Sequence, residues 1–129
     1  MALNNKRLAN PQVLVNNNPI AIIPNSLTFM EGLGEQTVEP HSAGGNNVFA
    51  VYAEDVSTRI GEVKFELANT EQNIALIRDW KLRGNDNVII INGEEFSRTF
   101  SNSVLSNNYE IGLGADTNIS LEFKSDPAV

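Results

Sequence analysis

One stretch of the sequence, residues 69–84, has the pattern of an amphipathic helix, and the segments around it have the patterns of strands and turns. Its apolar residues recur at helical spacing on one arc, whereas Ala75, Arg78 and Asp79 lie off that arc. A lone helix with one apolar face must bury that face on a sheet. The sequence therefore predicts a mainly β chain with one flanking α-helix over about residues 70–83, whose core side chains are Ile74, Leu76, Ile77 and Trp80.

Both ends of this helix carry sequence signals. Asn69 can act as the N-cap, and Gln72 follows it three residues later, as in a capping box. Lys81 and Arg83 suit the negative end of the helix dipole, and Gly84 can adopt the left-handed conformation that ends many helices. We therefore expect the helix to begin after Asn69 and to end before Gly84.

The composition restricts the class of protein. The chain has 129 residues, enough for one domain with a real core, and it has no cysteine for disulfides, thiolate metal sites or nucleophiles. Its formal net charge of −7 opposes tight binding to nucleic-acid phosphates. No apolar run follows Lys6 and Arg7, and no segment is long and apolar enough to cross a membrane, so we expect a cytoplasmic product without a membrane segment.

The N-terminal part is predicted to form a polar arm and a short hairpin. Residues 1–12 are polar, and the apolar runs at 13–15 and 20–23 flank an Asn-Asn-Asn-Pro sequence that favours a turn. Residues 26–30 are expected to extend the second strand of this hairpin.

A second, longer hairpin is predicted over about residues 36–54, with its turn at Gly44-Gly45. Little apolar surface lies at its tip, so this hairpin would not bury itself well on its own domain. Two interpretations follow, a mobile loop or an arm that contacts another subunit, and the pattern alone slightly favours the mobile loop.

Residues 56–67 are predicted to be one long strand, with Gly61 marking a bulge. Alternation places Val63, Phe65 and Leu67 on one face. The opposite face carries Glu62, Lys64 and Glu66.

Further strands are expected at residues 88–91, 96–101, 110–113 and 119–123, with the first of them fully buried. Asn92-Gly93 indicates a tight turn, and residues 103–108 read as an irregular link. About seven or eight short strands with no regular strand–helix alternation predict antiparallel sheets in a sandwich or barrel.

No group of residues in the sequence specifies catalysis or metal binding. His41 is the single histidine, so a hydrolase would have no other histidine as base. The adjacent acids Glu54-Asp55 and Glu94-Glu95 would point to opposite sides of a strand, and residues 112–116 have too few acids for a calcium loop. We therefore expect no enzyme activity, no cofactor and no metal.

A set of segments, taken in order, resembles the tail tube protein of tailed bacteriophages. The resemblance covers about residues 36–127 and rests on the ordered set, because no single segment is specific. The segments are Ser42–Gly45, Val51–Val56, Gly61–Leu67 leading into Thr70–Lys81, Phe96–Phe100, Leu113–Asp116 and Ile119–Phe123.

This resemblance implies an antiparallel sandwich or barrel, in agreement with the strand count. It implies a structural virion protein of the tail, assembled in the host cytoplasm, that forms stacked homo-hexameric rings. The implied tube has an acidic lumen through which DNA passes without tight binding. Sheath, tape-measure, baseplate or tip, and terminator proteins are the implied partners.

The resemblance also changes the interpretation of the long hairpin from a mobile loop to a docking arm. The candidate inter-subunit residues are Glu39, Pro40, His41, Gly44, Gly45, Asn46 and Asn47. The candidate lumen-facing residues are Glu62, Lys64 and Glu66, with Glu122 and Lys124 as weaker candidates.

Two alternative functions remain open from the sequence. One is the inner tube of a related contractile injection or type VI secretion system, which would share the fold. The other is a small ligand-binding β-sandwich module such as a lectin, although most aromatic residues have the phase of core residues and not of an exposed binding surface.

Overall fold

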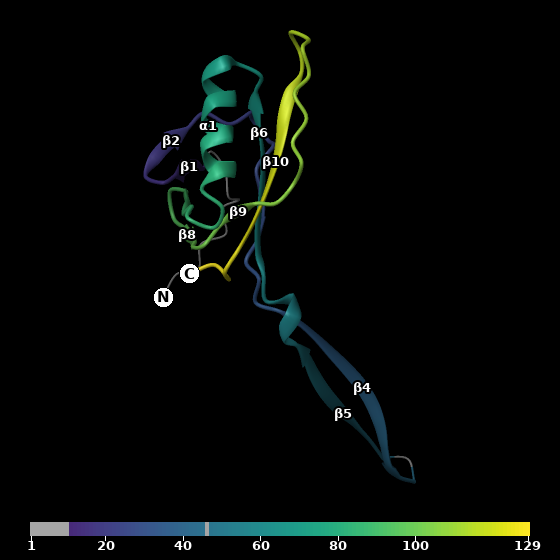
Figure 1. Ribbon diagram of the computed structural model, residues 1–129. Helices are drawn as coiled ribbons and strands as arrows, with labels where there is room; N and C mark the ends of the chain where they lie inside the picture. The colour runs from purple at the N-terminus through teal and green to yellow at the C-terminus, as the bar shows by residue number, and fades with distance from the viewer. Residues whose placement is uncertain (1–10, 46) are drawn as a thin grey trace.

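The computed structural model describes residues 11–45 and 47–129, which form antiparallel sheets and one α-helix (Figure 1). The polar arm expected at about residues 1–12 falls mainly outside the described residues, and Gln12 already belongs to the first strand. The strands are β1 (Gln12–Val15), β2 (Asn18–Ile20), β3 (Thr28–Met30), β4 (Glu35–Gly44), β5 (Asn47–Asp55), β6 (Gly61–Ala68), β7 (Ile89–Asn92), β8 (Ser97–Phe100), β9 (Val104–Leu105) and β10 (Asn118–Ser125). The helices are a 3₁₀ turn η1 (Val56–Thr58) and α1 (Glu71–Leu82).

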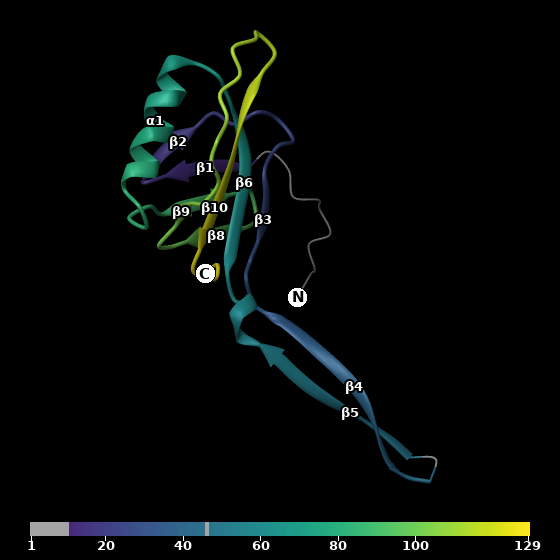
Figure 2. The ribbon, with the colours of Figure 1, turned by 45° about the vertical axis from the view of Figure 1, so that its right-hand side comes forward.

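The strands form two four-stranded sheets and one two-stranded hairpin. Sheet A has the order β2-β1-β7-β8, and sheet B has the order β3-β6-β10-β9. We call the β4–β5 hairpin the arm. Figures 1 and 2 place α1 and sheet A on the same side of sheet B, while the arm projects away from this body. The structure thus confirms a mainly β, sandwich-like antiparallel fold with one helix.

The core lies between the two sheets and α1. The rings of Phe65 and Phe123 stack with centroids 5.8 Å apart, and Trp80 meets them edge-on at 6.5 and 6.0 Å. Strand alternation supplies most of the rest, since β6 and β10 each bury every second side chain. The other buried apolar residues are Val13, Val15, Val63, Leu67, Ile77, Ile89, Ile91, Phe100, Leu105, Ile119 and Leu121.

Helix α1 has the predicted extent but a different N-cap. The Thr70 hydroxyl accepts a hydrogen bond from the Asn73 amide at 3.2 Å, whereas the Asn69 side chain bonds to the loop before β10. Arg83 is the C-cap, and Gly84 has φ = 63°, the left-handed stop expected there. On the core side, Ile77 and Trp80 are buried and Ile74 and Leu76 are half-buried.

The first hairpin is shorter than predicted. Asn16 and Asn17, with φ of 54° and 68°, form a two-residue turn between β1 and β2, and β2 ends at Ile20. Residues 26–30 do not extend β2, because β3 pairs with β6 in sheet B. The chain crosses between sheets at Ile23, whose carbonyl accepts a hydrogen bond from the Ser26 hydroxyl at 2.6 Å.

The predicted strand over residues 56–67 is also wrong in its first part. Asp55 caps η1 by accepting a hydrogen bond from the Ser57 amide at 3.0 Å, and β6 begins only at Gly61. Gly61 is not a bulge. A Cβ atom there would lie 2.5 Å from the Asp126 carbonyl oxygen, so the close approach of the C-terminal segment requires glycine.

The segments after α1 differ from the sequence-based prediction in smaller ways. In the strand expected at residues 88–91, Val88 is exposed and Ile90 only half-buried, because α1 and sheet B cover one face of sheet A. The turn after β7 closes through a hydrogen bond from the Gly93 amide to the Phe96 carbonyl at 2.9 Å. The expected irregular link contains β9, and residues 110–113 form no strand.

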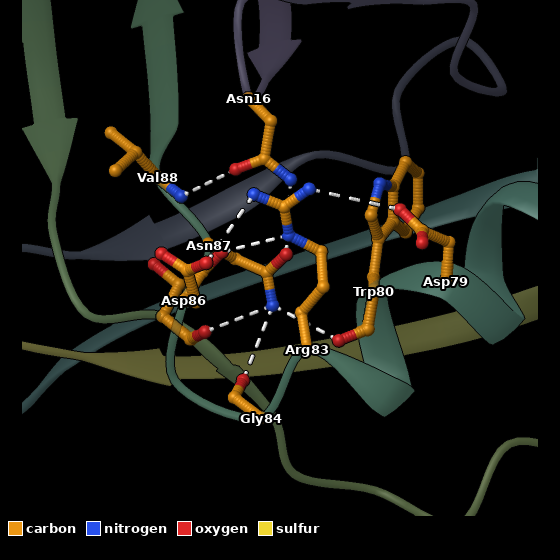
Figure 3. Close-up of polar contacts among 9 residues, drawn as sticks. Asn16, Asp79, Trp80, Arg83, Gly84, Asp86, Asn87 and Val88 are labelled. Atoms are coloured by element: carbon orange, nitrogen blue, oxygen red, sulfur yellow. Dashed lines mark hydrogen bonds and ion pairs between the residues drawn. The ribbon is translucent and has the colours of Figure 1, made fainter.

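A buried asparagine, Asn87, joins the end of α1 to the β1–β2 turn (Figure 3) and to the segment between β8 and β9. The Asn87 side-chain amide donates to the carbonyls of Trp80, Gly84 and Ser103 at 3.0 to 3.2 Å. Its carbonyl oxygen accepts a 3.0 Å hydrogen bond from Asn16 in the β1–β2 turn. Both its amide nitrogen and its carbonyl oxygen therefore have partners while only 1% of the residue is exposed.

We predict that Trp80→Ala lowers the free energy of unfolding by about 3–5 kcal/mol, because it opens a cavity beside Phe65 and Phe123. Leu82→Ala is the matched control, since Leu82 lies on the same helix with 84% exposure. Denaturant melts measure both variants, and an unchanged midpoint for Trp80→Ala would contradict the packing.

We predict that Asn87→Ala destabilises the fold by at least about 1–3 kcal/mol, because buried carbonyls lose their donor. Asn87→Asp should cost more, since a carboxylate would face those same carbonyl oxygens. Asn85→Ala, at an exposed position, should stay within about 0.5 kcal/mol of the wild type. Equal midpoints for the Asn85 and Asn87 variants would refute the bridging role.

Candidate functional site

The first candidate surface is the outer face of sheet B, which neither sheet A nor α1 covers (Figure 2). It is formed by the side chains that alternate with the core residues of β3, β6 and β10. The face comprises Thr28, Met30, Glu62, Lys64, Glu66, Ser120, Glu122 and Lys124.

Charges on this face are arranged in opposite-sign pairs. The β6–β10 register places Lys64 opposite Glu122 and Glu62 opposite Lys124. Along β6, the Lys64 ammonium lies 3.1 Å from a Glu62 carboxylate oxygen. Glu66 lies opposite Ser120 and has no cation directly across from it. Three carboxylates and two ammonium groups give this face a net charge of only −1.

The pairing shifts the ionisation of both partners. The hydrogen bond from Lys64 is the main cause that lowers the pKa of Glu62, and the same bond raises the pKa of Lys64. Each group therefore stays charged over a wider pH range than it would alone. Because both side chains contact water, this pair organises the surface more than it stabilises the fold.

Sequence reasoning found the charged residues of this face but missed Thr28, Met30 and Ser120. Thr28 and Met30 were expected to extend a different strand, and pairing of β3 with β6 brings them beside Lys64 and Glu62. The signal for Ser120 was present, since it alternates with the buried residues Ile119 and Leu121.

The second candidate surface is the arm, in which every residue of β4 and β5 is exposed. Directly paired residues share one face of a hairpin, so the register defines two faces. What we call the charged face carries Thr37, Glu39, His41, Phe49, Val51 and Ala53. What we call the uncharged face is the outer part of the opposite face, with Val38, Pro40, Ser42, Val48, Ala50 and Tyr52. At the base of the arm Glu54 has the same phase, and it is paired with Arg59.

The base of the arm is fixed to the body by polar contacts. The Thr58 hydroxyl accepts a 2.6 Å hydrogen bond from the Glu35 amide, and Arg59 forms an ion pair with Glu54. Just before the arm, Glu31 pairs with Arg98 of β8. These contacts hold the base of the arm, while its outer part extends into solvent.

The third candidate surface is the loop of residues 109–117, which we call the Leu113 loop. The Asn69 amide donates to the Gly112 and Gly114 carbonyls at 2.6 and 3.0 Å, and to the Thr117 hydroxyl at 2.6 Å. The carbonyls on both sides of Leu113 are thus held, while Leu113 itself is 97% exposed. Sequence reasoning interpreted Asn69 as a cap and missed this role.

The residues considered for chemistry are not brought together. Among the candidates, His41 lies 3.5 Å from Glu39 and 5.8 Å from the Phe49 ring, all on the arm. Glu94 and Glu95 are exposed between β7 and β8. Within residues 11–45 and 47–129, no three acidic or histidine side chains gather around a possible metal position. In the same ranges, no helix has the length and apolar character needed to cross a membrane.

Comparisons with known proteins give structural matches only. No family model matches the sequence, and no curated protein does. One similar structure is a chain of an extracellular contractile injection system, the PVC sheath–tube complex in its extended state. That chain has a TM-score of 0.58 and 12% identity, over 95% of this chain and 88% of the other.

A second similar structure is the anti-feeding prophage cap, described as a tube-terminating cap. It has a TM-score of 0.57 and 9% identity, over 100% of this chain and 94% of the other. At such identities the likeness establishes the fold. The chain therefore shares the fold of chains from a sheath–tube complex and a tube-terminating cap, in agreement with its resemblance to tail tube proteins.

Proposed function

We propose that this chain is a structural tail tube protein that forms hexameric rings, and that these rings stack into a channel. The observation that carries the proposal is the fully exposed arm on a body that has a tube-type fold. The chain acts as one domain whose work is assembly and not catalysis.

The arm supplies the contact between subunits. An isolated two-stranded hairpin is marginally stable in water, so an arm with no buried residue needs a neighbour to hold it. The neighbour is another copy of the chain, as in a closed or stacked assembly. The residues at or beside this contact are Glu39, Pro40, His41, Gly44, Gly45 and Asn47, together with Asn46, which lies outside the described residues.

The outer face of sheet B lines the channel. Its edge strands β3 and β9 have three and two residues, too short to offer a long ladder to an unrelated strand. In the ring, a neighbouring copy covers these edges. Glu62, Lys64 and Glu66 of β6 then project into the lumen, with Glu122 and Lys124 of β10 beside them.

The charge pairs explain how cargo passes without sticking. A phosphate approaching Lys64 or Lys124 must compete with a carboxylate already opposite that ammonium. The residual charge is weakly negative, so DNA is repelled slightly. The lumen is therefore better described as a neutralised surface with a small acidic excess than as a wall of carboxylates.

The second candidate function is the inner tube of a contractile injection system, favoured by the likeness to a chain of a sheath–tube complex. For a phage tail and for an injection tube alike, the proposed partners are a sheath, a tape-measure protein, a baseplate or tip, and a terminator. The proposed location of the phage form is the virion tail, after assembly in the host cytoplasm. A lectin-like module is less favoured, because the large exposed aromatics, Phe49 and Tyr52, lie on the arm and not around a pocket.

We predict that deleting residues 44–47 leaves a folded monomer that no longer forms tubes, because the shortened arm cannot reach its neighbour. Negative-stain microscopy measures assembly, and a denaturant melt checks the fold. Ala43→Ser keeps the length of the arm at a position outside the proposed contact residues and should assemble. Normal tubes from the deletion variant would rule out the docking arm.

We predict that Glu62→Lys with Glu66→Lys still gives tubes, but tubes that retain DNA at low salt and release it as salt rises, because unpaired ammonium groups then line the channel. Glu94→Lys with Glu95→Lys makes the same charge change away from this face and should not slow release. A map of the assembled tube with Glu62 and Glu66 on its exterior would exclude the lumen assignment.

A further inference from the structure

We propose that the uncharged face of the arm docks on the Leu113 loop of a second copy, in a head-to-tail contact. This inference rests on the proposed function and adds to it the two surfaces that meet.

The uncharged face is suited to burial. From Val38 and Tyr52 outward to Ser42 and Val48, none of its side chains is ionisable at neutral pH. Val38 and Tyr52 lie directly across from each other with exposures of 56% and 72%. The charged face carries Glu39 and His41 in the same stretch, and burying it would desolvate both.

The Leu113 loop is suited to receive it. A single exposed leucine is ordinary on a protein surface. Here, however, the backbone on both sides of Leu113 is held by Asn69 and Thr117, so the part of the chain that carries this side chain is fixed. Ile111 adds a second partly exposed apolar side chain to the same loop. A loop whose backbone is already held loses little backbone entropy on binding.

Charge selects between the two faces of the arm. The Leu113 loop also carries Glu110 and Asp116, both exposed. If the charged face docked there, Glu39 would approach these acids and be repelled. On the other side the one acid, Glu54 at the base of the arm, is already paired with Arg59, so the uncharged face is the face that the loop accepts.

The two elements lie at opposite ends of the molecule. The arm leaves the body at the Gly61 end of β6, and the β6–β10 register puts Asn118, directly after the Leu113 loop, opposite Ala68 at the other end. Figures 1 and 2 agree, with the arm at one end of sheet B and the yellow-green loop at the other. A contact between different surfaces of identical chains is heterologous, and it propagates from copy to copy.

Paired cysteines test this contact, because the chain has no native cysteine. A disulfide forms only where two Cα atoms come within about 4.4–6.8 Å. Two test variants both carry Leu113→Cys. The first adds Val38→Cys, and the second adds Tyr52→Cys. Two matched controls also carry Leu113→Cys. The first adds Thr37→Cys and the second adds Ala53→Cys, at positions that neighbour Val38 and Tyr52 in sequence but lie on the charged face.

Assembled tubes of each variant are oxidised and run on a denaturing gel without reductant. We expect a ladder of cross-linked copies from at least one uncharged-face pair and monomer from both controls. A ladder from the controls alone, or no ladder from any variant that forms tubes, would overturn the inference and leave the proposed function standing. Wild-type protein that forms no tubes would instead overturn the proposed function.

A second measurement is independent of cross-linking geometry. Leu113→Asp should raise the concentration needed for assembly by at least about tenfold, whereas Ala115→Asp, in the same loop, should not. An equal effect of both substitutions would mean that the loop acts through its charge and not through Leu113, which contradicts the proposed contact.

Discussion

The pairing of β6 with β10 is the interaction on which the rest of the structure depends. These strands pair over eight residues, from Gly61 opposite Ser125 to Ala68 opposite Asn118. Because side chains alternate, this register places Phe65 and its neighbours in the core and the charged residues on the outer face. A slip of one residue would bury Lys64 beside Trp80, so the core enforces the charge pairs outside it.

The segments that were predicted correctly are those with local periodicity. The helix around Trp80 and the strand of Phe123 repeat their patterns over enough residues to specify both element and face. The errors fall where the chain changes sheet or direction. Residues 20–30 and 56–60 contain strand-like apolar residues, yet a hydroxyl from Ser26 and a carboxylate from Asp55 turn the chain there. Both hydrogen bonds span only two or three residues, so Ser26 and Asp55 are local turn signals, which the apolar pattern around them outweighed in the prediction.

Asparagine shows a limit of sequence-based prediction at the candidate site, because its side chain can join segments that are far apart in the sequence. Its abundance was interpreted as a series of turns, and Asn16 and Asn17 do form one. Asn69 and Asn87, however, join segments far apart in sequence through their side-chain amides. An amide offers both donors and an acceptor, so one asparagine can tie a loop on two sides. The Leu113 loop is held by such hydrogen bonds from Asn69, whose partners lie more than forty residues away in the sequence.

The arm must stay exposed until it meets a partner, and its sequence limits the pairings open to it meanwhile. A two-stranded hairpin has two open edges, each able to pair with any strand. Pro40 has no backbone N–H, and proline fits a ladder only where its nitrogen faces away from the paired strand. The outer edge of β4 therefore lacks a donor at its centre, beside the polar residues Glu39 and His41. With backbone pairing discouraged there, recognition rests on side chains, and the arm gains its specificity from the uncharged face.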